Sequence, residues 1–451
     1  MEASLGLRRR IGLRSATSLV VGGTVGVGIF LAPAGMARGL ASPALVVAVW
    51  LLMGSAAVCG ALAFGELAAR FPRAGGSYVY LREAFGPGVA FLYGWKCLLV
   101  MDPGLTAALA TGAAAYAAAA FPGLPPLPIA LAAIAAGALS NAAGVRRAAA
   151  VGQVLAVAKI ALLLLLVGWA FLSGAAEVAN LLPFAARRAG APALLPALAG
   201  ALVAAFFSFG GWWEASKLAG EVSEAGRVLP RALTLGVAAV TLAYVAVSVA
   251  FMALVPLQAV SSPETFVAQA GAVLLGPAGG RVLSLLVALF VLGSLFAFMI
   301  FAPRVYYAMA RDGAAPALVG RLDPRTGAPL RAVAVQALLA AGLAAVGSFQ
   351  AIVSYFVFAT MAFLALTVAG LYRLPPPPPG RYRVPGWPVT PLVFLVLLLV
   401  TMALVASGSP RQALLGSLVV AAGIPVYWLR QARGGHRRPS AVAASPEMEE
   451  S

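Results

Sequence analysis

Two glycine-containing interruptions in long apolar segments have the composition of a binding site made from backbone groups. The first covers residues 21–30 (VGGTVGVGIF) and the second covers residues 207–212 (FSFGGW). In lipid each unsatisfied backbone group is costly, so a spanning helix is interrupted only where it lines protein or a polar cavity. Two such interruptions at matching positions of two halves indicate the substrate site of a secondary transporter.

An interrupted helix can bind the charged ends of a zwitterion such as an amino acid. The free N–H groups and the positive dipole end of a half-helix suit a carboxylate. Gly26 and Gly28 permit close approach to the backbone because they lack side chains. The second interruption, around Phe209 and Gly210, would offer carbonyl groups to an ammonium. We therefore expect the substrate between the two interruptions.

The same residues have alternative explanations. Glycines also let membrane helices pack closely, and we favour packing for Gly22 and Gly23 but binding for Gly26 and Gly28. An aromatic cluster surrounds the second interruption, where one ring is expected to close over the substrate, although any single ring could equally be a packing residue. Its members are Phe206, Phe207, Phe209, Trp212 and Trp213.

Charged residues inside apolar segments are functional candidates because the burial of charge in lipid is costly. Lys159 lies about ten residues into the segment 149–172. A desolvated lysine could couple transport to protons, although a lysine can also extend toward a membrane interface. Asp102 could hold a substrate amine or exchange protons, or it could pair with Lys96 or another helix; these alternatives stay open.

Other charged residues are expected to form ion pairs near the cytoplasmic ends of the spans. Glu214 and Lys217 are about one helical turn apart, a spacing that favours a structural pair. Glu66, Arg70 and Arg73 are expected to form the ion pairs of an inner gate.

The composition predicts an all-α integral membrane protein. Of the 451 residues, 62% are hydrophobic and 10% are charged, whereas about a quarter of a globular chain is charged. We predict twelve transmembrane helices, each long enough to cross about 30 Å of hydrocarbon. They cover residues 17–40, 43–69, 84–118, 127–143, 149–172, 195–217, 232–255, 281–310, 331–347, 350–372, 388–407 and 412–430.

These spans are expected to form a 5+5 inverted repeat in which helices 1 and 6 are discontinuous. A cytoplasmic N-terminal segment, residues 1–16, precedes the first five-helix repeat, 17–172. The second five-helix repeat covers 195–372, helices 11 and 12 cover 388–430, and a cytoplasmic disordered tail covers 431–451. A proline run at 375–379 is expected to be a stiff linker.

The charge pattern indicates orientation rather than a nucleic-acid partner. The net charge is +17, but the arginines are concentrated in short loops that share one side of the membrane. This distribution places both termini in the cytoplasm. Cys59 and Cys97 fall within predicted spans, so no disulfide framework is expected. The single histidine, His436, lies in the tail, and we expect no metal site and no cofactor.

Five motifs in order resemble the amino acid–polyamine–organocation superfamily, most closely its L-type amino acid transporter branch. The resemblance covers about residues 15 to 430. The motifs are GVGIF at 26–30, FGELAARFPRAGGSYVY at 64–80, FGGW at 209–212 with EV at 221–222 and RVLPRA at 227–232, RVYYAMARDG at 304–313, and RVPGWPVTP at 383–391.

The resemblance implies a leucine-transporter-like fold and assigns roles at the first interruption. It places the substrate carboxylate near Val27, Gly28 and Ile29. The substrate ammonium would lie near Ile29 or Thr24 and near residues 207–209, and Phe207 would be the lid.

The resemblance also implies a role for Lys159. Its ammonium would stand where a sodium ion sits in sodium-dependent relatives, bridging spans one, five and eight. It would contact carbonyl groups near Gly23 or Thr24, with Ser294 as a neighbour.

The implied function is sodium-independent alternating-access transport of amino acids across the cell membrane, by exchange (antiport) or proton symport. A polyamine or other organic-cation antiporter of the same fold is the alternative, although only Asp102 is an obvious cavity acid. The loop at 121–128 lacks the cysteine by which animal members bind a glycoprotein subunit, so no disulfide-linked partner is implied. Membrane lipid is expected to surround the protein.

Three other classes of protein are disfavoured. No catalytic constellation indicates an enzyme, and no filter loop indicates a channel. A structural scaffold would not need two costly helix interruptions.

Overall fold

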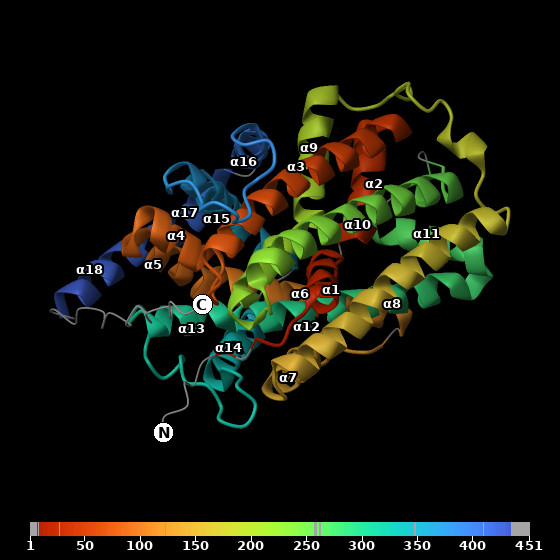
Figure 1. Ribbon diagram of the computed structural model, residues 1–451. Helices are drawn as coiled ribbons and strands as arrows, with labels where there is room; N and C mark the ends of the chain where they lie inside the picture. The colour runs from red at the N-terminus through yellow and green to blue at the C-terminus, as the bar shows by residue number, and fades with distance from the viewer. Residues whose placement is uncertain are drawn as a thin grey trace, which may run out of the picture.

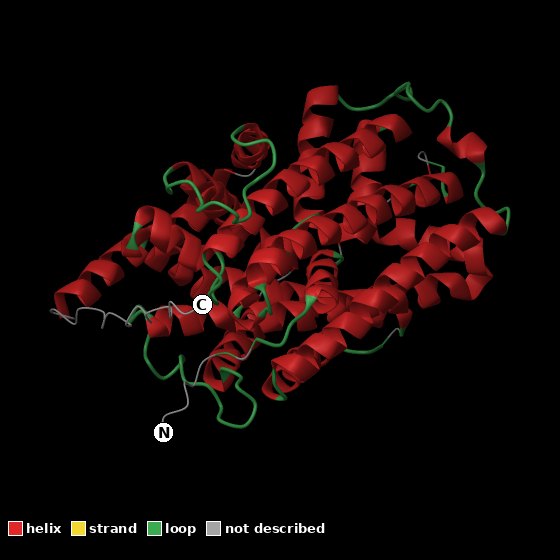
Figure 2. Ribbon diagram, viewed as in Figure 1, coloured by secondary structure: helices red, strands yellow, loops and turns green. Residues whose placement is uncertain are grey.

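The computed structural model is all-helical over the part of the chain that it describes, which confirms the expected fold class (Figures 1 and 2). The described residues are 7, 9–26, 28–121, 123–256, 259–260, 263–346, 349–408 and 410–433. The prediction for Val27 lies outside these residues, as does that for the tail beyond residue 433.

The described residues up to 172 form eight α-helices and one π-helical turn. They are α1 (Leu13–Thr24), α2 (Gly28–Leu40), α3 (Pro43–Arg70), α4 (Ser77–Phe85), α5 (Pro87–Lys96), the π-helix η1 (Cys97–Met101), α6 (Asp102–Ala120), α7 (Pro126–Ala142) and α8 (Val145–Leu172).

The described chain after residue 172 begins with the 3-10 helix η2 (Val178–Leu181). It contains the second interrupted span, which consists of α9 and η3. The further elements are α9 (Leu194–Ser208), the 3-10 helix η3 (Trp212–Glu221), α10 (Ala225–Leu254), α11 (Pro263–Leu275), η5 (Gly276–Ala278), α12 (Gly279–Phe301), α13 (Pro303–Arg311), α14 (Leu330–Val346), α15 (Phe349–Ala369), η6 (Gly370–Tyr372), α16 (Val389–Gly408), α17 (Pro410–Ala421) and α18 (Gly423–Arg433).

The described helices make this a multi-pass membrane protein. Eight helical segments are long and apolar enough to cross a bilayer, and the pair α1 and α2, bent by 52° at its break, would be a ninth. Three shorter apolar helices, Pro126–Ala142, Leu330–Val346 and Val357–Tyr372, coincide with the remaining predicted spans. Twelve crossings and the inverted repeat stay predictions.

The two interrupted spans pack against each other at the centre of the molecule (Figure 1). Helix α2 packs against α9, whereas α1 packs against η3. Helix α1 also contacts α8, α10 and α12, which surround it. The two interruptions therefore meet in the protein interior, where backbone groups released from helices are shielded from lipid.

The end of η3 is held in place by an ion pair with α13 and by hydrogen bonds to the N-terminal segment of the chain. The Arg304 Nε and Nη2 atoms donate to the carboxylate of Glu221 at 2.7 and 3.2 Å, and both side chains are buried. The backbone N–H groups of Arg10 and Ile11 donate to the Glu221 carbonyl at 2.8 and 3.0 Å. These contacts fix the end of η3 against α13 and the start of the chain.

The residues expected at an inner gate lie at the same end of the molecule as the segment that connects α15 to α16. Glu66 pairs with Arg70, and Arg73 pairs with Glu83. The Glu66 Oε2 atom also accepts a hydrogen bond from the Val384 N–H at 2.6 Å. The carboxylate of Glu66 therefore connects α3 to the segment before α16.

Candidate functional site

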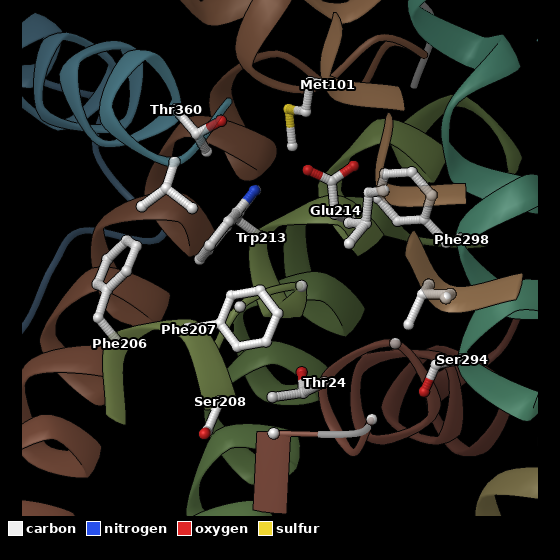
Figure 3. Close-up of a pocket in the computed structure, with 18 residues that line it drawn as sticks. Thr24, Met101, Phe206, Phe207, Ser208, Trp213, Glu214, Ser294, Phe298 and Thr360 are labelled. Atoms are coloured by element: carbon white, nitrogen blue, oxygen red, sulfur yellow. The ribbon is translucent and has the colours of Figure 1, made fainter. Parts of the chain in front are cut away.

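A cavity lies between the two interruptions, and most of the residues expected at a substrate site line it (Figure 3). The predicted residues in its wall are Thr24, Gly26, Gly28, Phe207, Gly210 and Ser294. The sequence did not assign a substrate-binding role to several further wall residues, among them Glu214, Phe298 and Thr360. Phe206 and Trp213, members of the predicted aromatic cluster, also line the cavity.

Four predicted site residues lie beside the cavity rather than in its described wall. Asp102 and Lys159 each belong to a separate buried network. Ile29 is completely buried. Phe209 packs its ring against Trp50 and Tyr244, with ring centroids 5.9 and 5.3 Å apart. Phe209 therefore supports the interruption from behind.

The backbones of the two spans touch where they are interrupted. A Cβ atom on Gly28 would lie 2.7 Å from Ser208 Cα, and one on Gly211 would lie 2.5 Å from the Gly23 carbonyl oxygen. Gly211 also has φ of +114°, a conformation that residues with a side chain rarely adopt. Glycine is therefore required on both spans for the crossing that forms the cavity.

The Tyr244 hydroxyl joins the two interruptions. Its oxygen lies 3.0 Å from the Thr24 carbonyl oxygen and 2.8 Å from the Ser208 carbonyl oxygen. The hydroxyl has one proton to donate, so it serves one carbonyl at a time. Both carbonyls lie at the C-terminal end of a half-helix, where helical partners are missing. Tyr244 on α10 was not singled out from the sequence.

Lys159 extends from α8 to the C-terminal end of α1 and is buried there. Its Nζ atom donates to the carbonyl oxygens of Gly22 and Val25 at 2.9 and 2.8 Å, and to Ser294 Oγ at 2.7 Å. An ammonium has three N–H donors, and all three have acceptors here. The negative end of the α1 dipole adds to the attraction. Ser294 Oγ lies 2.7 Å from the Val25 carbonyl, which completes the junction of α1, α8 and α12.

Asp102 belongs to a buried ion-pair network with two residues of η3. Asp102 Oδ1 lies 3.2 Å from Lys217 Nζ, and Glu214 Oε2 lies 2.5 Å from the same ammonium. The three side chains are at most 1% exposed. Asp102 thus pairs with another helix, and the expected pair of Glu214 and Lys217 forms beside the cavity.

A π-helical turn positions Asp102 for this pairing. Pro103 has no N–H and disfavours an ordinary helix in the preceding turn. The Asp102 N–H donates to the Cys97 carbonyl, five residues earlier, so that η1 is wider than an α-helix. Such turns are frequent at functional sites.

Lys96, at the end of α5, is stabilised mainly by aromatic rings. Its ammonium lies 4.8 Å from the ring centroid of Tyr93 and 5.6 Å from that of Phe363. It also contacts Met101 S at 3.0 Å and Thr360 Oγ1 at 3.5 Å. Aromatic faces attract cations, and the described residues place no carboxylate within 4 Å of Lys96. The ammonium lies behind Met101 and Thr360, which themselves line the cavity.

The cavity offers different chemistry at its two ends (Figure 3). Thr24, Ser208 and Ser294 gather around the interruptions at one end, together with the backbone of both spans. Glu214 lies at the other end with Met101. The Phe207 ring lies between these ends. The arrangement can bind a small molecule that has polar groups at one end and a side chain that extends past aromatic rings.

Known amino acid transporters are similar to this chain over most of its length. The amino acid permease family model matches residues 11–429. A cystine/glutamate transporter of Pongo abelii is 27% identical over 435 residues, which cover 94% of this chain and 85% of that protein. The human Asc-type amino acid transporter 1 is also 27% identical, with coverage of 94% and 82%. A mouse b(0,+)-type amino acid transporter 1 is 27% identical, with coverage of 81% and 76%.

Proposed function

Because the chain belongs to the amino acid permease family, we propose that it moves amino acids across the membrane by alternating access. It is a transporter and not an enzyme. Its substrate site is the cavity between the two interrupted spans. The observation that supports this most strongly is the glycine-dependent crossing of the spans, since backbone breaks inside a membrane persist only around protein or a polar cavity.

The polar end of the cavity suits the α-carboxylate and α-ammonium of the substrate. Helix α2 begins at Gly28, so its free N–H groups and positive dipole end are available to the carboxylate. Residues 207–210 at the end of α9 offer carbonyl groups to the ammonium. Gly26 and Thr24 form the adjoining wall, and Phe207 closes over the bound substrate.

Transport is sodium-independent because Lys159 supplies a fixed positive charge at the junction of α1, α8 and α12. Transporters that use sodium coordinate it with the carbonyl groups of unwound helices. Here the Gly22 and Val25 carbonyls are already hydrogen-bonded to the lysine. The coupling mode is either exchange or proton symport, and in the second case Lys159 and Ser294 are the coupling pair.

The protein lies in the cell membrane with both termini in the cytoplasm, the side to which the arginine-rich loops are assigned. No disulfide-linked subunit is part of this proposal, because the loop at 121–128 contains no cysteine and Cys59 and Cys97 lie within helices α3 and η1. A polyamine or other organic-cation antiporter is the second candidate. It is favoured by the acid at one end of the cavity, Glu214, and disfavoured by the helix N-terminus, which suits a carboxylate.

The experiment that tests this proposal is uptake of radiolabelled amino acids by liposomes that contain the purified protein. Uptake in the absence of sodium, dependent on protein and abolished by excess unlabelled amino acid, is expected. Liposomes that take up putrescine or spermidine but no amino acid would favour the second candidate.

A further inference from the structure

Glu214 has an unusual position for a carboxylate, since it is completely buried and yet lies in the wall of the cavity. It is the only charged residue among the described residues of that wall. Its Oε1 atom has no hydrogen-bond partner among the described residues. Burying a carboxylate without full satisfaction of its oxygens is costly, so its presence in the wall of a cavity indicates a role.

The ion pairs around Glu214 leave part of its carboxylate without a direct partner. Among the residues that the structure describes, Lys217 is the one cation within ion-pair distance of both Asp102 and Glu214. Two carboxylates therefore share one ammonium. Lys96 is close enough for its charge to interact with both carboxylates. It forms no ion pair with either one among the described residues, because its ammonium is held against the rings of Tyr93 and Phe363. A cation in the cavity that contacted Glu214 would give its Oε1 atom a direct partner.

The aromatic wall near Glu214 favours a positive charge as well. Trp213 lies directly before Glu214 in η3, and Phe298 and Phe207 line the same cavity (Figure 3). Aromatic faces attract ammonium and guanidinium groups, more strongly where water is excluded. A carboxylate side chain of a substrate would instead meet the charge of Glu214 and the negative faces of these rings.

We propose that Glu214 recognises the positively charged end of the substrate side chain, so that the protein prefers basic amino acids to neutral and acidic ones. This inference rests on the proposed function. The α-carboxylate and α-ammonium bind at the interruptions, and the side chain extends past Phe207 toward Glu214. A guanidinium can donate two parallel hydrogen bonds to a carboxylate. Asp102, held by Lys217, is a positioning residue that acts through this lysine.

The test compares arginine with citrulline, which has the same shape but a neutral urea group. Binding to the purified protein is measured by the change in intrinsic fluorescence, for which Trp213 in the cavity wall is a built-in reporter, and by thermal stabilisation. Leucine and glutamate are measured alongside. We expect arginine to bind at least about tenfold more tightly than citrulline, a difference of about 1.4 kcal/mol, and glutamate to bind more weakly than leucine.

The variant Glu214→Gln should reduce the preference for arginine over citrulline to less than about twofold while leucine binding persists. Glu177→Gln is the matched control, because Glu177 is an exposed carboxylate directly before η2, outside the cavity. It should keep the preference for arginine.

Several results would overturn the inference. If the wild-type protein binds leucine but does not prefer arginine to citrulline, the inference is wrong and the proposed function stands. If Glu214→Gln weakens the binding of all four amino acids equally, or changes only the pH dependence of binding, the Glu214 carboxylate does not recognise the side chain of the substrate. If none of the four amino acids binds or enters liposomes, the proposed function fails, and the inference fails with it.

Discussion

The ammonium of Lys159 lies 2.9 Å from the carbonyl oxygen of Gly22, across 137 positions of sequence. This hydrogen bond joins α8 to the last turn of α1, at the point where α1 stops being helical. With the contacts to Val25 and Ser294 it satisfies backbone groups that the interruption would otherwise leave unpaired. The same residue therefore stabilises the break and supplies the charge that we assign to coupling.

Lys159→Ala should abolish most uptake and lower the melting temperature of the protein. The change removes the lysine donor from the Gly22 and Val25 carbonyls, and the Ser294 hydroxyl near both has only one proton to donate. A buried polar group that loses its partner costs about 1–3 kcal/mol. Any remaining uptake should no longer respond to a pH gradient. Ser294→Ala is the milder comparison, since it keeps both contacts between the lysine and the carbonyls. Unchanged uptake and pH response in Lys159→Ala would reduce Lys159 to a packing role.

Gly28→Ala should prevent substrate binding although only one methyl group is added. The new Cβ would lie 2.7 Å from the Cα of Ser208, so the two spans would have to separate. Gly35→Ala is the matched control on α2, because no atom lies within 4 Å of its added Cβ. In liposome uptake, Gly35→Ala should retain activity. Normal uptake by Gly28→Ala would show that the close crossing is not needed.

Tyr244→Phe should weaken substrate binding severalfold without unfolding the protein. The variant removes only the hydroxyl that lies between the Thr24 and Ser208 carbonyls, and one hydrogen bond contributes about 1 kcal/mol, or roughly fivefold in affinity. Tyr372→Phe loses an exposed hydroxyl contact to the Pro388 carbonyl and serves as the control. Equal substrate affinities for the two variants would argue against a role for the Tyr244 hydroxyl in shaping the cavity.

Lys217→Met should destabilise the protein strongly, because it removes the ammonium that forms the ion pairs of Asp102 and Glu214. Removing one partner of a buried pair costs about 3–5 kcal/mol. Adding Asp102→Asn to Lys217→Met should recover part of the lost melting temperature, since one uncompensated charge is then removed. Thermal unfolding of the single and double variants in detergent measures this. A double variant less stable than Lys217→Met would contradict the shared-lysine arrangement.

Hydrophobic length, glycine position and charge placement were enough to predict the helical class and the two interruptions, whereas the family was predicted from the resemblance of five motifs. The glycines at 26 and 28 were informative because a break in lipid has few physical causes. The contacts of Lys159 were expected near Gly23 or Thr24, and the structure places them at Gly22 and Val25. That difference of one residue follows from how α1 ends, which apolar length does not determine.

Glu214 shows what the sequence did not reveal. Its spacing from Lys217 predicted an ion pair, and the structure contains it. However, Gly211 with positive φ turns the chain into the 3-10 helix η3, so Glu214 faces the cavity rather than a cytoplasmic end. Asp102 was the expected cavity acid, but the π-helical turn before Pro103 directs it to Lys217 instead. Local backbone geometry of this kind depends on tertiary contacts that periodicity does not encode.

The most direct measurement is entry of a radiolabelled amino acid into liposomes that contain the protein, with sodium absent and with or without internal amino acid and a pH gradient. We predict protein-dependent entry that requires either internal amino acid, as in an exchanger, or an inward proton gradient, as in a symporter. Entry that occurs only with sodium would contradict the assignment of Lys159, and no entry of any amino acid under these conditions would contradict the proposed function.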